Sequence, residues 1–250
     1  MKLILLFLST FFLIHCNSYG LYDKLTSNSS NSGSNAACFD NGTGIVKNGL
    51  LAYWNLNGNF NDKWDCGTGF QFGSGSNFSF VTDRFGIAGN AVNLAASTGI
   101  VNFGNLPEYQ TSPFTLCSWI RLPLGGTANG LVGKYTGTTG WRLDAGSTTM
   151  DVYLDNAGAV AVSTGSWSTV WYYACLVYDS AASPAITAYR GVYSGGIISA
   201  SGAGSFTGTA TNLALNPNAW SAALEYDDVA FYRRALTAAE VQQNFTATEQ

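Results

Sequence analysis

Residues 226–245 read YDDVAFYRRALTAAEVQQNF, a stretch that begins like a β-strand and ends like a helix. Thr237 precedes Glu240 by three residues, which is the spacing of a capping box at the first turn of a helix. We therefore expect a strand over 226–232 that leads directly into a short closing helix.

Two adjacent carboxylates stand at the start of this strand. Because side chains alternate along a strand, Asp227 shares a face with Val229 while Asp228 shares the other face with Ala230. Whichever face is buried, one acidic side chain then needs a partner.

Short apolar runs recur upstream, separated by Gly, Asn, Ser and Thr. The opening run, GLLAYWNLNGNFND at 49–62, alternates and carries an Asn-Gly turn signal. The other runs that we expect to form strands are 91–94, 100–103, 114–122, 131–135, 141–145, 149–154, 159–163, 171–179 and 185–190. The sequence DNAG at 155–158 predicts a tight hairpin. About eleven short strands with polar connections are typical of two packed antiparallel sheets.

Composition agrees with an all-β chain. Of the 250 residues only 10% are charged and 14% are aromatic, and 29 are glycine. Acidic residues outnumber basic ones by 15 to 11, and the longest basic cluster is Arg233-Arg234. This balance argues against nucleic acid as a partner and against electrostatic binding to anionic lipid.

The N-terminus predicts export. An apolar run over 3–14 is too short to span a bilayer, so we interpret residues 1–15 as a signal peptide. Cleavage before Cys16 would leave a lipid-modified cysteine, as the resemblance of 13–16 to a bacterial lipoprotein box implies, although His15 departs from that box. Cleavage after Gly20 is the alternative and would release a soluble protein. Residues 16–48 form a polar tether and leading segment, followed by one domain over 49–250.

Four further cysteines, an even number in an exported chain, predict disulfides. They are Cys38, Cys66, Cys117 and Cys175. Of the three connectivities we favour Cys38–Cys66, which ties the start of the domain to its first loop, and Cys117–Cys175, which joins two predicted strands. Buried free thiols remain the alternative.

The closing stretch resembles the end of the laminin G-like, concanavalin A-like jelly-roll modules of secreted bacterial proteins. The matching residues are Asp227, Asp228, Val229, Tyr232, Arg234, Ala235, Leu236, Thr237, Glu240 and Val241. GLLAYWNLNGNFND, TDRFGIAGNAVNL, FTLCSWIRL and WYYACLVYD follow the order of that family's other landmarks. Two features depart from it: AYRGV at 188–192 replaces the usual Tyr-Val-Asn-Gly turn, and no glycine precedes the last strand.

The resemblance implies an all-β, two-sheet antiparallel jelly roll with a short C-terminal helix over about 49–248. It also implies a structural calcium ion between the first loop and the last strand, with Asp62 and Asp227 or Asp228 as ligands. Calcium prefers such oxygen ligands. The alternative is that these acids cap turns and backbone amides.

Catalysis has little support in the sequence. His15 is the only histidine and lies in the predicted signal, so histidine-dependent triads, general bases and zinc sites are excluded from the mature chain. Related glucanases carry Glu-x-Asp-x-(x)-Glu, and Glu225-Tyr226-Asp227 begins that way. Val229 and Ala230 stand where the second glutamate should be, so we expect no enzyme, with a glycan hydrolase as the weaker alternative.

Strand alternation also suggests ligand-binding residues. If the aliphatic faces are buried, aromatic, arginine and aspartate side chains face outward, and these groups can stack on and hydrogen-bond to a sugar. The candidates are Trp119, Arg121, Arg142, Asp151 and Tyr153. We predict an exported, lipid-anchored, non-catalytic surface module that binds a glycan or a glycosylated or extracellular-matrix protein. A structural envelope protein without a sugar site is the further alternative.

Overall fold

The computed structural model describes residues 44–64, 73–163, 165–219 and 223–249. Contacts divide the chain into residues 1–36 and 37–250, and the described residues belong to the second unit. Its strands are β1 (Leu50–Trp54), β2 (Ser74–Ser76), β3 (Phe78–Val81), β4 (Ala91–Leu94), β5 (Ile100–Asn102), β6 (Phe114–Arg121), β7 (Ala128–Tyr135), β8 (Gly140–Ala145), β9 (Thr149–Leu154), β10 (Ala157–Ser163), β11 (Trp171–Tyr178), β12 (Ile186–Val192), β13 (Ile197–Gly202), β14 (Ala214–Leu215) and β15 (Leu224–Tyr232). The helices are the 3₁₀ turns η2 (Pro107–Gln110) and η3 (Pro217–Ala219) and the α-helix α2 (Ala238–Thr248).

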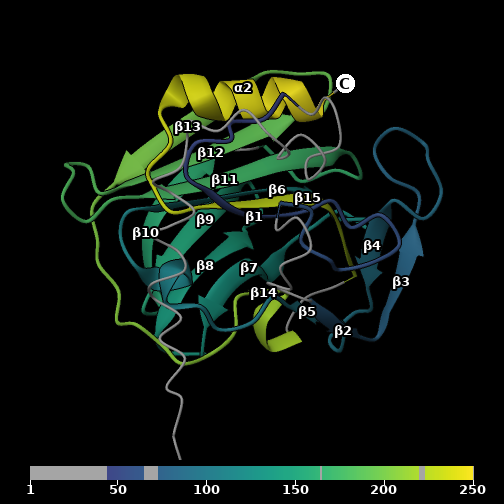
Figure 1. Cartoon of the computed structure of the whole chain (residues 1–250), viewed down its shortest axis with the longest axis horizontal. Coiled ribbons are helices and arrows are strands. Elements are labelled where there is room, and N and C mark those ends of the chain that lie inside the picture. Colours follow the sequence, from purple (N-terminus) through teal and green to yellow (C-terminus); the bar gives the residue numbers. More distant parts are fainter. Residues whose placement is uncertain (1–43, 65–72, 164, 220–222, 250) are drawn as a thin grey trace, which may run out of the picture. The chain divides into compact units, whose positions relative to one another are not determined.

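The strands form two antiparallel sheets that pack face to face (Figure 1). The eight-stranded sheet has the order β13-β12-β11-β6-β15-β4-β3, and β1 also pairs with β15. The seven-stranded sheet has the order β10-β9-β8-β7-β14-β5-β2. The predicted all-β, two-sheet architecture is confirmed.

A continuous hydrophobic core fills the space between the sheets. Large rings join the two layers: Phe114 of β6 packs on Trp141 of β8, with centroids 5.1 Å apart. Trp54 of β1 stacks on Phe103, which follows β5, at 4.0 Å. Because alternate residues of each strand supply this core, the intervening residues project to the two outer faces.

Helix α2 covers the outer face of the eight-stranded sheet (Figure 1). The predicted capping box is present, since Thr237 Oγ1 accepts from the Glu240 backbone and the Glu240 carboxylate accepts from the Thr237 backbone. Val241 and Phe245 of the helix pack into a second apolar cluster on this face. No helix among the described residues is long and apolar enough to cross a membrane.

Strand boundaries follow the predictions closely where the apolar pattern is strong. Strands β4 and β9 match the predicted ranges residue for residue, and the DNAG hairpin has Asp155 and Asn156 at positive φ, as a two-residue turn requires. Strands β2, β3, β13 and β14 were not predicted, because they are short, glycine-rich or serine-rich. AYRGV lies within β12 rather than in a turn.

The predicted pairing of faces in the last strand is wrong. The register of β15 against β6 shifts between Asp227 and Ala230, and Asp228 has a φ of 47°. This β-bulge adds one residue, so Val229 lies in the central core while Asp227 pairs with Trp119 on the outer, helix-covered face.

Candidate functional site

The outer face of the seven-stranded sheet brings three of the predicted ligand-binding residues together. Arg142 of β8 lies directly opposite Tyr153 of β9, and Asp144 lies opposite Asp151. The residues between them on both strands belong to the central core. Alternation therefore directs these four polar and aromatic side chains to the outer face, as predicted for Arg142, Asp151 and Tyr153.

Arg142 is held between two aromatic rings. Its guanidinium carbon lies 4.2 Å from the ring centroid of Tyr153 and 4.4 Å from that of Tyr135 on β7. Its Nε donates to both carboxylate oxygens of Asp144 at 3.0 Å. A cation stacked on aromatic faces and fixed by a carboxylate has a defined orientation, so this cluster is rigid before any ligand arrives.

Asp144 fixes the arginine from a buried position. Only 3% of the residue is exposed, and Oδ1 also accepts from the Gly130 backbone N–H at 2.6 Å. Burial raises the pKa of Asp144, although the hydrogen bond from Gly130 and the charge of Arg142 act in the opposite direction. The carboxylate is thus lost on acidification at a higher pH than for an ordinary aspartate.

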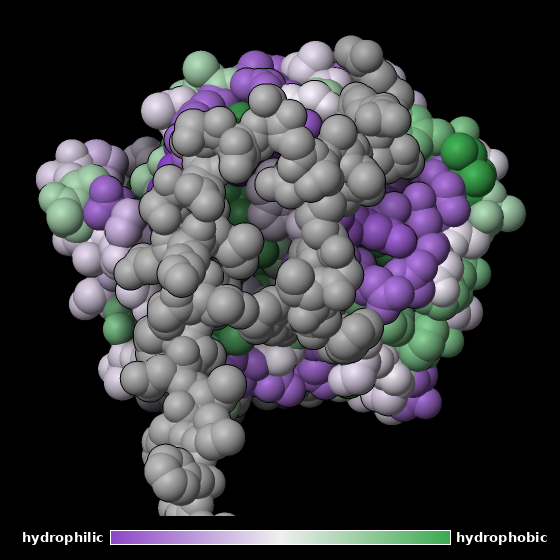
Figure 2. All heavy atoms as spheres, viewed as in Figure 1, coloured by the Kyte–Doolittle hydropathy of each residue, from purple (hydrophilic) through white to green (hydrophobic). Residues whose placement is uncertain are grey.

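A shallow pocket of about 280 Å³ lies next to this cluster. Asp151 and Tyr153 form one side, and residues 158–161 of β10 form the other. Tyr153 and Asp151 are half-buried, so an aromatic face and a carboxylate border the same hollow. Figure 2 shows hydrophilic and hydrophobic residues intermixed over the described part of the face in view. The pocket thus offers one carboxylate and one aromatic ring opposite small and aliphatic residues of β10.

The other two predicted ligand-binding residues lie on the opposite sheet. Trp119 of β6 faces outward from the central core, but α2 covers it and leaves it 0% exposed. Its Nε1 donates to Thr248 Oγ1 of the helix at 2.8 Å. The prediction that Trp119 faces solvent is wrong, because the C-terminal helix packs on this face. Arg121 is half-buried, forms an ion pair with Glu225 and lies over the ring of Trp171.

Arg84 is the partner that the acidic pair requires. Its two terminal nitrogens contact the carboxylates of Asp227 and Asp228, and its Nε donates to the Thr248 carbonyl at 2.7 Å. The Tyr53 hydroxyl donates to Asp228. Burial and the neighbouring charge of Asp228 raise the pKa of Asp227, while Arg84 acts to lower it. One guanidinium thus joins β15, the loop after β3 and the end of α2.

The predicted calcium ligands do not fit a calcium ion as their side chains lie. Arg84 occupies the carboxylates of Asp227 and Asp228 with a positive charge. Asp62 Oδ1 accepts from the backbone N–H groups of Tyr53 and Trp64, both at 2.9 Å, so Asp62 caps its own turn at Trp64 and joins that turn to β1 at Tyr53. Within the described ranges, no group of three or more His, Cys, Asp or Glu residues is arranged to hold a metal.

The partial glucanase motif lies on the helix-covered face. Glu225 is paired with Arg121 and lies opposite it on β6, and Asp227 is paired with Arg84. Both residues are at most 5% exposed. They are therefore separated from the pocket on the other sheet, and each has an arginine partner.

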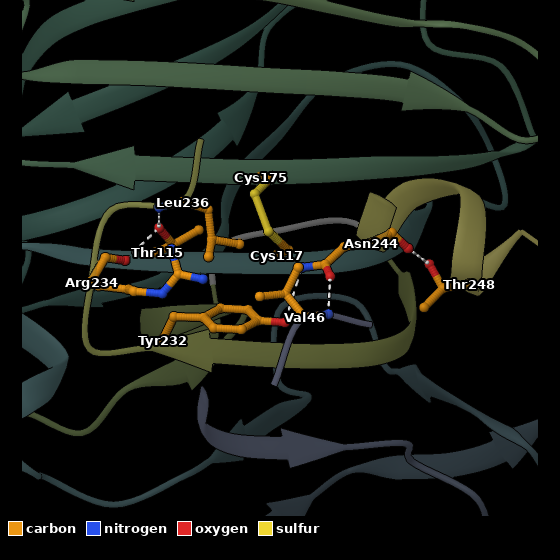
Figure 3. Close-up of a disulfide and its surroundings, with 9 residues drawn as sticks. All are labelled: Val46, Thr115, Cys117, Cys175, Tyr232, Arg234, Leu236, Asn244 and Thr248. Carbon is orange, nitrogen blue, oxygen red and sulfur yellow. Dashed lines mark hydrogen bonds between the residues drawn. A yellow bond between two sulfur atoms is a disulfide. The ribbon is translucent and has the colours of Figure 1, made fainter. Parts of the chain in front are cut away.

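The predicted disulfide between Cys117 and Cys175 is present (Figure 3). The two cysteines are directly opposed on β6 and β11, beneath α2. Asn244 of the helix accepts from the Val46 N–H and donates to the Tyr232 hydroxyl, so the helix is also tied to the first and last parts of the domain (Figure 3). The predicted Cys38–Cys66 pair and the lipidation site Cys16 lie outside the described residues.

Sequence reasoning missed Arg84 and Tyr135. Arg84 belongs to the TDRFGIAGN landmark, and the need of two adjacent buried acids for a cation was the signal that pointed to an arginine. Tyr135 alternates with the core residues of its strand, but its contact with Arg142 crosses from one strand to the next and carries no local signal.

Comparison with known proteins places the fold. A model of the concanavalin A-like lectin/glucanases superfamily matches residues 95–242, more than half of the chain. Among solved structures, the receptor-binding domain of botulinum neurotoxin type G is 13% identical, with a TM-score of 0.56, and the match covers 80% of this chain and 51% of that one. The binding domain of botulinum neurotoxin DC in complex with SialylT is 12% identical, with a TM-score of 0.54 and coverages of 82% and 52%.

A sialidase of Trypanosoma rangeli in complex with sialic acid is 15% identical, with a TM-score of 0.54 and coverages of 82% and 34%. The chain thus spans about half the length of the neurotoxin domains and about a third of the sialidase. No curated protein sequence matches the chain. The family match and the two-sheet jelly roll lead to one conclusion: the chain belongs to the concanavalin A-like lectin/glucanases superfamily.

Proposed function

We propose that this protein is a non-catalytic binding module for glycans, and that the sugar binds on the outer face of the seven-stranded sheet. The observation that carries the proposal is the Tyr153–Arg142 stack at 4.2 Å, which borders the Asp151 pocket. The face of the Tyr153 ring can contact the C–H groups of a sugar, while the Asp151 carboxylate can accept hydrogen bonds from its hydroxyls. Similar solved structures include complexes with SialylT and with sialic acid, which supports a sugar as the ligand class.

The test is a binding screen across a broad glycan panel, followed by titration of the best ligand. Replacing Tyr153 by Ala removes the stacking face, so we expect affinity to fall about tenfold, which corresponds to about 1.4 kcal/mol. Tyr189→Ala is the matched control, because Tyr189 packs with the apolar cluster under α2. Equal affinities of the two variants would place the ligand elsewhere.

A protein partner is the second candidate. The binding domain of botulinum neurotoxin DC also occurs in a complex with rat synaptotagmin II, and its similarity to this chain supports a protein as the alternative ligand. A protein partner would be favoured if no glycan of the panel bound and if the wild type, but not Tyr153→Ala, captured a defined extracellular protein.

Hydrolysis of a glycan is the alternative to non-catalytic binding, and an activity assay distinguishes the two. The one motif that begins like that of a glucanase lacks its second glutamate, and both of its acids are paired with arginines. We expect no product from β-glucans. Release of reducing sugar that depends on Glu225 would overturn the non-catalytic proposal.

We further propose that the protein is exported and held at a membrane by a lipid on Cys16. The apolar run before Cys16 supports this proposal. Intact mass of the mature protein measures it: a chain that begins with a lipid-modified Cys16, and a Cys16→Ser variant released in soluble form, are the expected results. A mature chain that begins at Leu21 would contradict lipidation.

A further inference from the structure

Arg190 of β12 lies on the inner side of the eight-stranded sheet, next to the edge strand β13. Arg190 of β12 lies directly opposite Ala174 of β11 on one side and Ile198 of β13 on the other. Directly opposed residues project to the same face of a sheet. Ala174 is fully buried in the central core, whereas Ile198 is 47% exposed. Arg190 therefore stands at the boundary where the space between the sheets reaches solvent.

The charge of Arg190 has aromatic neighbours but no acid. Its guanidinium carbon lies 4.4 Å from the ring centroid of Tyr172 and 5.8 Å from that of Trp167. Only 7% of Arg190 is exposed, and within the described part of the chain it forms no ion pair and its Nε has no hydrogen-bond acceptor. Four other arginines do contact a carboxylate: Arg84, Arg121, Arg142 and Arg234.

The groups around Arg190 are fixed in place. Trp167 Nε1 donates to the Thr149 carbonyl at 2.9 Å, which anchors the indole against β9. The Tyr172 hydroxyl accepts from the Ser168 backbone N–H at 2.9 Å. The guanidinium thus lies between two rings that have little freedom to move, with a hydroxyl network at its edge.

A bound anion would supply the negative charge that the Arg190 guanidinium lacks. A buried cation without a counter-charge is costly, and aromatic faces offset only part of that cost. Burial lowers the pKa of Arg190, while the Tyr172 hydroxyl acts to raise it, which is the behaviour of a cation short of negative partners. The flat fork of a guanidinium matches the two oxygens of a carboxylate.

We propose that Arg190 binds the carboxylate of an acidic sugar, whose ring lies against Ile198 at the open edge. That the carboxylate belongs to a sugar rests on the glycan-binding function proposed above. The site is separate from the Tyr153 pocket, because Arg190 projects between the sheets whereas Tyr153 projects from the outer face of the other sheet.

The experiment follows the Arg190 Nε–H signal by NMR in the full domain, assigned by its loss in Arg190→Lys. Sodium glucuronate and its neutral methyl ester are the two probes. We expect glucuronate to shift the Arg190 signal in a saturable way and the ester to leave it unmoved. This comparison uses the unaltered protein, so it does not depend on whether a variant folds. No shift with glucuronate, or equal shifts with both probes, would overturn the proposal.

Substitutions test whether glucuronate binds at Arg190 or at another site. Arg190→Met should weaken glucuronate binding at least tenfold, whereas Tyr189→Ala, which alters the opposite face of β12, should leave it unchanged. Loss of the response in Tyr153→Ala would move the carboxylate to the outer face and overturn the assignment to Arg190. If no glycan of the panel binds in a way that depends on Tyr153 while glucuronate still shifts Arg190, the Tyr153 pocket falls as the glycan site and the Arg190 site stands. If inorganic sulfate shifts the signal and glucuronate does not, the sugar carboxylate is excluded.

Discussion

Arg84 donates from Nη1 to Asp227 and from Nη2 to Asp228, so that one guanidinium holds two successive carboxylates of β15. The side chain of Arg84 is 2% exposed, and the side chains of the two acids are 4% and 11% exposed. The bulge at Asp228 makes this possible, because it turns both carboxylates toward the loop that carries Arg84.

Replacing Arg84 by Met should therefore destabilise the domain strongly. The variant leaves two buried carboxylates without their cation, and breaking a buried pair in this way costs about 3–5 kcal/mol. Unfolding in urea measures the loss. A triple variant with Asp227→Asn and Asp228→Asn removes the stranded charges and should recover a large part of it. A loss below about 1 kcal/mol in Arg84→Met would show that solvent reaches the two acids.

Calcium should leave the melting temperature of the wild-type domain unchanged relative to a chelator. A ligand raises stability only if it binds the native state, and the Arg84 guanidinium already occupies both carboxylates. Arg84→Met is the informative comparison, because its uncovered carboxylates attract a cation and its melting temperature should rise with calcium. A rise of several degrees in the wild type would restore calcium as a native ligand.

These contacts mark the limit of what the sequence could predict. Strand positions such as those of β4 and β9, and the cap at Thr237, follow from local patterns and were predicted residue by residue. The bulge at Asp228 breaks the alternation on which face assignments rest, and nothing in the local pattern signals it. Arg84 lies 143 residues before Asp227 in the chain, so only the folded structure reveals their contact.

In the candidate site, too, local pattern predicted some features and only the folded structure revealed the others. Arg142, Asp151 and Tyr153 were placed on an outer face by alternation within their own strands, and they do converge. Trp119 obeys the same alternation, but α2 packs over it. Alternation identifies which residues leave the core, and a second layer of structure decides whether they reach solvent.

The pair of Glu240 with Arg234 should make helix α2 sensitive to acid. The hydrogen bond from Arg234 lowers the pKa of Glu240 from 4.5 to about 2. Because the folded state holds the ionised form, the stabilisation is present above about pH 4.5 and is lost as the pH falls toward about 2. Glu240→Gln should remove this part of the pH dependence, measured as the free energy of unfolding between these limits.

Thr237→Ala is the control for that measurement. It removes the cap and should cost about 1 kcal/mol at neutral pH. It leaves the Arg234–Glu240 contacts at 2.6 and 2.8 Å, so most of the acid dependence should remain. Identical pH profiles for wild type and Glu240→Gln would contradict the assignment to Glu240.

The Cys117–Cys175 disulfide should stabilise the domain and resist reductant while the domain is folded. It closes a separation of 58 residues, which by the chain-entropy relation contributes about 4 kcal/mol through the unfolded state. Urea unfolding of a Cys117→Ala/Cys175→Ala variant measures this stabilisation.

Both cysteines are at most 1% exposed and lie under the apolar cluster of α2, so a thiolate reaches them only when the helix or the whole domain opens. Reduction followed by mass spectrometry measures this protection. The rate of reduction should rise steeply near the unfolding midpoint, and Val241→Ala, which loosens the helix, should raise the rate in native buffer. Rapid reduction of the native wild type, with no response to Val241→Ala, would mean that the helix does not protect the bond.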